Sequence, residues 1–368
     1  MHPIAGVLGV ALLAIALVDA FQTVVVARHA HKLSAMTRMF YKLTWTPFAA
    51  GARLIRSEPR RENYLGIYGP LSLLLLLVLW AVSLIAAFAM IHWSIDPQRN
   101  GAFSSFADDV YFSAATFFTL GTGAPQNLAS KYLMVLEAGF GFSFLGLVIG
   151  YLPVLYQSFS SRELKILLLD ARAGSPPSPV QLLLRLGSDP SYLEERLADW
   201  EEWALDLLQN HLSYPMLAYY RSQHGNQSWL AALTTVVDVS ALAILGAEDR
   251  LKRQAEFTFA AGRHALVHTA SIFRRRPQHP QSDRLSSADF TRLCSIITDS
   301  HTPMRPARIS EAELTKLRSM YEPYANALAA YFGMALPPWI PSGEAPDNWQ
   351  INSWESVKRR RRGRSPVG

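Results

Sequence analysis

The stretch YFSAATFFTLGTGAPQNL, residues 111–128, decides the fold. It places Thr119, Gly121 and Gly123 between two apolar segments, and glycine at such a place indicates backbone conformations that other residues avoid. The apolar residues before Thr119, 103–118, are too few to cross the roughly 30 Å of a bilayer core. The stretch therefore predicts a short helix that enters the membrane partway and ends in a glycine-containing loop.

A loop at that depth has a strict chemical requirement. Non-helical backbone inside a membrane is tolerated only where it is buried in protein or lines a watery path, because its peptide groups otherwise lack partners. Gly121 and Gly123 allow the carbonyls of Thr119, Leu120, Gly121, Thr122 and Gly123 to face one axis, and the Thr119 hydroxyl adds another oxygen. A ring of such oxygens replaces the water around a cation, so the sequence predicts a pore or cavity here.

Three apolar windows are long enough to cross the membrane as helices: residues 4–26, 65–91 and 132–157. Their only charged residues are Asp19 in the first window and Glu137 in the third. We expect the first window to be a membrane helix rather than a cleaved signal peptide, because no Lys or Arg precedes it. For Asp19 we expect a hydrogen bond between helices.

Basic residues predict the orientation of these helices. Residues 28–64 contain eight Lys and Arg, whereas the connection between the second and third windows contains only Arg99 and Lys131. By the positive-inside rule the first connection is cytoplasmic and the second external, with the N-terminus outside and the C-terminal domain in the cytoplasm. Asp108 and Asp109 then stand near the start of the short helix, where a helix favours negative charge. Attraction to anionic membrane lipid explains the basic segment without nucleic acid.

The segment SAATFFTLGTGA resembles the potassium channel superfamily. It carries Thr116, Thr119, Gly121 and Gly123 where members of that superfamily carry the pattern T-x-x-T-V-G-Y-G-D, and residues 65–157 match the order of outer helix, pore helix, filter and inner helix. The resemblance implies an all-α membrane protein of the plasma (inner) membrane. It also implies a homotetramer, because one chain supplies a single pore loop and a carbonyl ring needs several.

The same resemblance implies passive conduction of K⁺ or another monovalent cation at Thr119, Leu120, Gly121, Thr122 and Gly123, with no cofactor and no enzymatic activity. Thr122 stands where the superfamily has an aromatic residue that holds the loop, Leu120 replaces its valine, and Ala124 replaces its acid. A nonselective or sodium-permeable cation channel is therefore one alternative. A nonconducting membrane receptor or anchor is the other.

Two further sets of residues are expected to serve this path. Thr116 and Glu137 are predicted to support the filter, Glu137 by a hydrogen bond to the pore helix or the filter backbone rather than by ion contact. Gly150 and Pro153 form a candidate hinge, because proline removes a backbone hydrogen bond near the cytoplasmic end, where inner helices of the superfamily bend. Alternatively, Gly146 and Gly150 form a helix-packing face.

These features divide the chain into four parts. Residues 1–64 hold the N-terminal transmembrane helix and a basic cytoplasmic linker, 65–158 the pore domain, 159–345 a helical cytoplasmic domain, and 346–368 a basic tail. The single cysteine, Cys294, excludes an intrachain disulfide framework.

The helical cytoplasmic domain contains no sequence motif that identifies a ligand. We therefore expect a cytoplasmic ligand of unknown identity. The apolar run from Trp229 to Leu245 contains Asp238 and is expected to be a buried core helix rather than a fourth span. With the residues that follow it, this run could form one long helix or two helices joined near Gly246. Further helices are expected around residues 286–299 and 309–332, and linkers at 174–179 and 274–287. An aromatic group is expected to pack in the core rather than bind a ligand: Trp200, Trp203, His211, Tyr219 and Tyr220.

Overall fold

The computed structural model describes residues 2–24, 35–96, 98–99, 102–103, 105–121, 123, 125, 127–279, 282–300 and 302–341. The chain divides into two units. The membrane unit comprises Met1–Leu54, Ile67–Ser158 and Ser213–Leu217, and the helical unit comprises Ile55–Gly66, Phe159–Leu212 and Ala218–Gly368. Thr122, Ala124 and the predicted basic tail, residues 346–368, lie outside the described residues.

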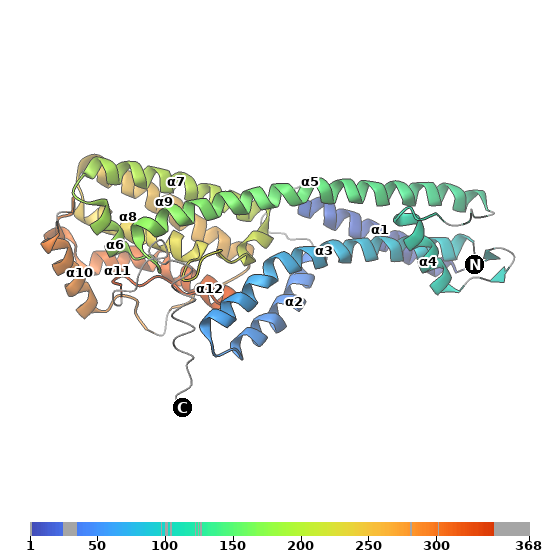
Figure 1. Ribbon diagram of the computed structural model, residues 1–368, viewed down its shortest axis with the longest axis horizontal. Coiled ribbons are helices and arrows are strands. Elements are labelled where there is room, and N and C mark those ends of the chain that lie inside the picture. The colour runs from blue at the N-terminus through green and yellow to red at the C-terminus, as the bar shows by residue number, and fades with distance from the viewer. Residues whose placement is uncertain are drawn as a thin grey trace, which may run out of the picture. The chain divides into compact units, whose positions relative to one another are not determined.

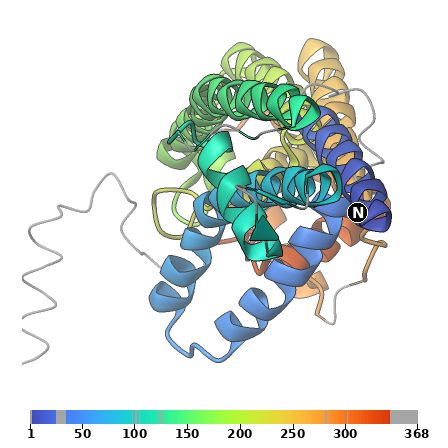
Figure 2. The same cartoon turned by 90° about the vertical axis from the view of Figure 1, so that its right-hand side faces the viewer.

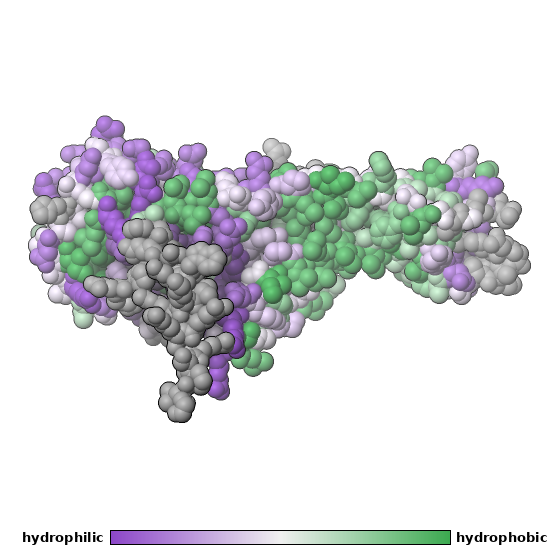
Figure 3. Space-filling model, viewed as in Figure 1, coloured by the Kyte–Doolittle hydropathy of each residue, from purple (hydrophilic) through white to green (hydrophobic). Residues whose placement is uncertain are grey.

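Three helices that contribute to the membrane unit are long and apolar enough to cross a bilayer: α1 (Pro3–Val24), α3 (Glu58–Ile95) and α5 (Leu128–Ala173). They overlap the three windows that the sequence predicts, and Figure 1 shows their course. Their visible surface is largely apolar in Figure 3, and side chains such as Val78 and Phe142 are exposed. Exposed apolar surface on long helices suits a lipid environment, and the chain is an all-α membrane protein.

Helix α1 packs on α3 through small residues. A Cβ atom at Gly6 would lie 2.6 Å from Ser94 Oγ, and one at Gly9 would lie 2.8 Å from the carbonyl oxygen of Ala87. Small residues allow membrane helices to approach this closely, because no side chain separates the backbones. The first apolar window is thus packed against the second within the membrane unit.

Asp19 joins three helices at one carboxyl group. The Thr37 backbone N–H donates to Asp19 Oδ1 at 3.1 Å, the Thr37 hydroxyl donates to Oδ2 at 2.6 Å, and Trp80 Nε1 donates to Oδ2 at 2.8 Å. The predicted interhelical hydrogen bond of Asp19 is therefore confirmed. Thr37 lies in the first turn of α2 (Ala35–Arg53), a helix that the sequence interpretation treated only as basic linker. Asp19 satisfies an N–H group that the start of a helix leaves without an intrahelical partner.

The short helix α4 (Phe106–Phe117) lies where the sequence predicts a short helix, and its partial entry into the membrane stays a prediction. Its 12 residues are too few to cross the bilayer. Phe117 packs in an apolar cluster with Ile85 of α3, and Phe144 of α5 and Leu13 of α1 pack against that cluster. Figure 2 looks along the long helices and shows α4 in front of them. A two-residue antiparallel pair, β1 (Gln98–Arg99) and β2 (Ala102–Phe103), precedes α4.

The described part of the helical unit is built from helices joined by short connections (Figure 1). Of the two alternatives for the long helical stretch, the structure has two helices that meet near Gly246, and the predicted helix over 309–332 is divided in two. After α5 the elements follow in this order: α6 (Pro179–Leu186), α7 (Pro190–Ser213), η1 (Pro215–Tyr219), α8 (Trp229–Gly246), α9 (Asp249–Ile272), α10 (Ser287–Asp299), η2 (Pro306–Arg308), α11 (Glu311–Ser319) and α12 (Glu322–Phe332).

Helix α8 is a core helix, as the sequence predicts, although its length and composition would also allow it to cross a membrane. Of its most apolar window, 89% is buried within the protein. Asp238 at its middle is fully buried and accepts from Arg284 Nη2 at 2.6 Å and from the Tyr321 hydroxyl. Burial alone would lower the pKa of Arg284, but the charges and hydrogen bonds of Asp238, with the charge of Glu322, raise it above its usual value. The buried acid is therefore fully paired, as a buried charge requires.

Residues 274–287 form the predicted linker between α9 and α10, and most of its described residues are exposed, but Arg284 is fixed by a distant partner. Its side chain is only 10% exposed, and Ser287 already begins α10. The predicted linker at 174–179 is a buried connection, in which Ser178 Oγ donates to the carbonyl oxygen of Trp339 at 2.8 Å. The proline and arginine content of these two segments predicted loops correctly. It could not show that the loop at 174–179 bonds to Trp339 and the loop at 274–287 to Asp238.

The aromatic group that includes His211 packs in the core of the helical unit. Trp200, Trp203, His211 and Tyr219 are each at most 5% exposed, which confirms the packing interpretation for these four residues. The rings of His211 and Trp229 meet edge to face with centroids 4.6 Å apart. Burial, with a smaller contribution from the charge of Arg162, lowers the pKa of His211 to about 3.

We expect His211→Phe to make the helical unit less sensitive to acid. An unfolded histidine takes up a proton below about pH 6.5, whereas the folded ring stays neutral down to a pH of about 3. The parent protein therefore keeps its full stability above about pH 6.5 and loses roughly 2 kcal/mol by pH 5, a loss that the phenylalanine variant avoids. The measurement is urea unfolding of the full-length protein in detergent, followed by proteolysis of the helical unit. The exposed His264→Phe is the control, and an equal acid loss in parent and His211 variant would contradict the prediction.

Candidate functional site

The start of α4 is fixed by a capping box. Ser105 is the N-cap residue: its Oγ accepts from the Asp108 backbone N–H at 3.3 Å, and its own N–H donates to Asp108 Oδ2 at 2.9 Å. Two groups that a helix start leaves without partners are satisfied together. Asp109 beside it is fully buried. Both acids thus stand in the first turn, where the sequence predicted them and where the helix dipole favours negative charge.

The end of α4 reverses the chain within two residues. Leu120 N–H donates to the carbonyl oxygen of Ala115 at 2.8 Å, and Thr119 N–H donates to that of Thr116 at 3.0 Å. This pair of hydrogen bonds is the Schellman pattern, in which the residue after the helix cap adopts a left-handed conformation and is usually glycine. Here that residue is Thr119, with φ at 57°. A β-branched residue in this region costs about 1–3 kcal/mol, so the reversal is held by its surroundings.

The loop then alternates in backbone handedness. Thr119 and Gly121 have positive φ angles, 57° and 81°, and Leu120 between them does not. In an extended strand, successive carbonyl groups point to opposite sides. When the sign of φ changes from each residue to the next, successive carbonyl groups can instead point to the same side. The Leu120 side chain is 74% exposed, and Gly121 and Gly123 are exposed as well. The predicted filter residues therefore lie on an open surface of the single chain, apart from Thr122, which is not described.

The predicted support residues lie behind this loop. Glu137 on α5 is fully buried, and the Ser113 hydroxyl on α4 contacts its Oε1. The hydrogen bond that the sequence predicted between Glu137 and the pore helix is therefore present. Thr116 is 3% exposed, and its hydroxyl has no hydrogen-bond partner among the described residues. The role of both residues as supports of the filter stays a prediction.

Ser113 and His92 belong to the same site, and the sequence interpretation missed them. His92 on α3 is fully buried, and its Nε2 lies 3.2 Å from Glu137 Oε2. The Ser113 hydroxyl also lies 2.9 Å from the carbonyl oxygen of Ile85 on α3. A histidine at the end of an otherwise uncharged apolar window was the available signal, because such a residue in a membrane usually has a buried partner.

Close backbone contact fixes the end of α4 against α5. A Cβ atom at Gly141 would lie 1.9 Å from the carbonyl oxygen of Phe117, the last residue of α4. By contrast, Cβ atoms at Gly139 and Gly146 would meet nothing within 4 Å. Gly141 is thus the glycine of α5 whose missing side chain positions the helix that carries the loop, whereas Gly146 does not pack against α3 within the chain.

The candidate hinge lies farther along α5. The helix continues through Pro153, and a Cβ atom at Gly150 would meet nothing within 4 Å. Tyr151, the residue after Gly150, is buried in the membrane unit. Its hydroxyl donates to Met216 Sδ at 3.6 Å and its ring meets Tyr214 with centroids 5.8 Å apart. The segment Ser213–Leu217, which connects α7 to α8, therefore contacts the inner helix next to the candidate hinge.

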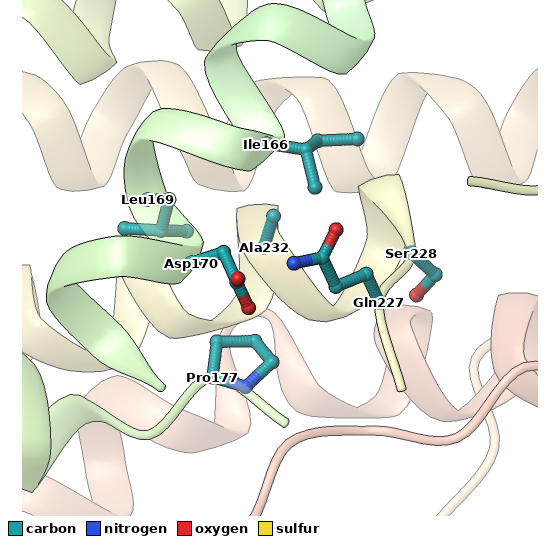
Figure 4. Close-up of a pocket in the computed structure, with 7 residues that line it drawn as sticks. All are labelled: Ile166, Leu169, Asp170, Pro177, Gln227, Ser228 and Ala232. Carbon is teal, nitrogen blue, oxygen red and sulfur yellow. The ribbon is translucent and has the colours of Figure 1, made fainter. Parts of the chain in front are cut away.

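A small pocket in the helical unit does not identify a ligand (Figure 4). Asp170 of α5, Pro177, and Gln227 and Ser228 before α8 contribute to its lining, and it leaves no space for a water molecule. The amide of Gln227 is buried there without a hydrogen-bond partner among the described residues. Within the described residues, no group of three or more His, Cys, Asp or Glu side chains is placed to hold a metal ion. The unknown cytoplasmic ligand stays a prediction.

Comparison with known proteins matches part of the chain to a family model. No curated protein and no solved structure matches the chain. Residues 73–157 match the family model described as "Ion channel". The matched segment includes most of α3, all of α4, the loop after it, and α5 as far as the candidate hinge. This part of the all-α membrane protein is therefore similar to an ion channel domain.

Proposed function

We propose that the chain is a homotetrameric cation channel that conducts potassium through the backbone carbonyls of Thr119, Leu120, Gly121, Thr122 and Gly123. The observation that carries the proposal is the turn after α4, where positive φ angles at Thr119 and Gly121 alternate with Leu120. Such alternation suits carbonyls that replace the water around a cation. The turn follows a helix that is held between α3 and α5.

The proposed tetramer is supported by surface that a single chain leaves uncovered. Only 11% of the most apolar window of α5 is buried, compared with 61% for α3. The loop residue Leu120 is 74% exposed. A closed ring of identical chains would cover both surfaces, because each copy presents the same α5 and the same loop to its neighbours.

The proposed location is the plasma (inner) membrane, with the N-terminus external and the helical unit cytoplasmic. The basic residues of the segment from 28 to 64 support this orientation, since positive charge is retained on the cytoplasmic side and attracts anionic lipid. The helical unit is proposed to bias the gate in response to an unidentified ligand. The contact of Tyr151 with Met216 supports this role, because it places a connection between α7 and α8 beside Gly150.

A nonselective or sodium-permeable pore is the second candidate. Thr122 and Ala124 support it, since they replace the aromatic and acidic residues that the resembling superfamily uses to hold its filter. A looser loop would fit potassium less closely. The two candidates share the ion path and differ in selectivity.

For the ion path, we expect the purified protein in liposomes to pass potassium faster than sodium and Gly121→Ala to abolish the flux. Alanine at a φ of 81° is strained by about 1–2 kcal/mol, so the loop shifts and its carbonyls lose alignment. Gly187→Ala is the matched control, because Gly187 has a φ of 74°, similarly open space at Cβ, and a place in the helical unit. Equal sodium and potassium fluxes would favour the second candidate. Absence of any cation flux, with no change in Gly121→Ala, would leave a nonconducting receptor or anchor.

We also expect Gly141→Ala to eliminate potassium flux while Gly139→Ala preserves it. The added methyl group at Gly141 would lie 1.9 Å from the carbonyl oxygen of Phe117, so α4 must move and carry the loop with it. The same change at Gly139 meets nothing within 4 Å in the chain. Size-exclusion chromatography of both variants separates lost conduction from lost assembly. Normal flux through an assembled Gly141→Ala protein would refute the packing argument.

For the hinge, Gly150→Ala should lower the open probability about fivefold per subunit in single-channel recordings. Alanine stabilises straight helix by about 1 kcal/mol over glycine, and the structure has α5 continuous at this position. Gly146→Ala is the control. It stabilises the helix by the same amount one turn before the hinge and should leave gating unchanged. If the two variants changed gating equally, or mainly disturbed assembly, the glycine pair would be a packing face instead.

A further inference from the structure

Helix α2 carries a face that the membrane unit leaves uncovered. Met39 and Leu43, one turn apart, are 58% and 64% exposed, although both side chains are large and apolar. Arg38, which is half-buried, and Lys42, which is exposed, stand directly before them in the sequence. No residue of α2 is acidic. The face therefore combines apolar and basic side chains and has no negative charge of its own.

Contacts within the membrane unit fix the two ends of this face. Thr37 donates two hydrogen bonds to Asp19, and Trp80 of α3 donates to the same carboxyl group. Two turns later, the Thr44 hydroxyl lies 2.8 Å from the hydroxyl of Tyr68 on α3. Tyr68 stands near the start of the apolar part of α3, and Trp80 lies about 18 Å farther along the helix. The segment of α2 from Thr37 to Thr44 therefore runs from inside the apolar part of α3 toward its beginning.

The beginning of that apolar part is the level of the lipid headgroups. The ring of Trp45 meets the ring of Tyr68 edge to face, with centroids 4.8 Å apart. Tryptophan and tyrosine are enriched at the boundary between hydrocarbon and water, because each has an apolar body and a polar end. Arg38 and Lys42 precede Trp45 by about two turns and one turn of α2. Their side chains are long enough to reach the headgroups from this depth.

Charge and shape select the chemistry of the partner. Among the described residues, neither Arg38 nor Lys42 forms an ion pair with an acid. Basic groups at headgroup depth attract anionic lipid, and a planar guanidinium can donate two parallel hydrogen bonds to a phosphate. Apolar side chains beside them suit the boundary between headgroups and acyl chains. A second copy of the chain fits less well, because it would bring its own Arg38 and Lys42 against these two and like charges repel.

We propose that α2 is a binding site for an anionic phospholipid, in which Arg38 and Lys42 hold the headgroup phosphate and Met39 and Leu43 lie against the acyl chains. Helix α2 lies outside residues 73–157, the segment that matches the ion channel family model. Through Thr37, lipid bound at α2 acts on the carboxyl group that also holds α3, the outer helix of the proposed channel. An effect on conduction rests on the proposed function, whereas the lipid site does not.

The test measures which lipid lies beside α2 in the full-length protein. Cys294 is the single cysteine, so Leu43→Cys in a Cys294→Ser background accepts one fluorescent label, which spin-labelled lipids quench on contact. In phosphatidylcholine vesicles we expect spin-labelled phosphatidylglycerol to bind there more tightly than spin-labelled phosphatidylcholine, by roughly fivefold for each basic residue. Arg38→Gln with Lys42→Gln should remove the preference. Lys252→Gln with Arg253→Gln, which removes two exposed charges from α9, is the matched control and should keep it.

Three results would overturn the lipid site. The first is equal quenching by the two lipids in the parent, or an unchanged preference in Arg38→Gln with Lys42→Gln. The second is absence of quenching by either lipid, because protein, such as a second copy, would then cover Leu43. The third is loss of the preference in inorganic phosphate but not in chloride of equal ionic strength, because the site would then take a free anion.

Flux measurements separate the lipid site from the proposed function. Potassium flux through the parent should change with the phosphatidylglycerol content of the vesicles, and flux through Arg38→Gln with Lys42→Gln should not. Flux through the parent that is independent of lipid would refute the coupling of α2 to α3. A lipid preference without any cation flux would reject the proposed function and leave the lipid site standing. Cation flux without a lipid preference would do the reverse.

Discussion

The constraint on which the membrane unit depends is that a short helix packed among long apolar helices must satisfy its last backbone carbonyls within the protein. Helix α4 does so by reversing at Thr119, whose N–H and that of Leu120 bond back to the last turn. The reversal requires a left-handed threonine, which is strained by itself. Contacts elsewhere must therefore hold it, and the approach of Gly141 to Phe117 is one of them.

The two acids inside the apolar windows follow the same logic. Hydrophobic burial does not drive helices together in lipid, so close packing and polar contacts specify their arrangement. Asp19 joins α1, α2 and α3 through Thr37 and Trp80, and Glu137 joins α3, α4 and α5 through His92 and Ser113. Each acid is expensive to bury and is placed where one side chain fixes several helices. Together they connect the N-terminal helix to the helix that carries the loop.

Features that depend on a local pattern of residues could be predicted from the sequence. Features that depend on a contact with a residue distant in the sequence could not. The windows around α1, α3 and α5, the short α4 and the buried α8 follow from length and apolar composition. Helix α2 was missed because its basic residues concealed an apolar face, and its first turn depends on Asp19 of another helix. Arg284 does lie in the predicted linker, but no local signal shows its pairing with Asp238. At the site, residue types predicted the hydrogen bond of Glu137, but the contact with His92, 45 positions away, has no local signature.

The alternation of Thr119, Leu120 and Gly121 has a consequence for selectivity in the proposed channel. In the resembling superfamily an aromatic residue holds the filter from behind, and Thr122 cannot do so over the same distance. The described structure instead fixes the loop at its inner end, through the Schellman turn, Gly141 and the contacts of Ser113. Among the described residues of the loop, Thr119 is therefore the one restrained through α4. In the proposed channel, the geometry of the carbonyl at Thr119 would depend on how α3 and α5 hold α4.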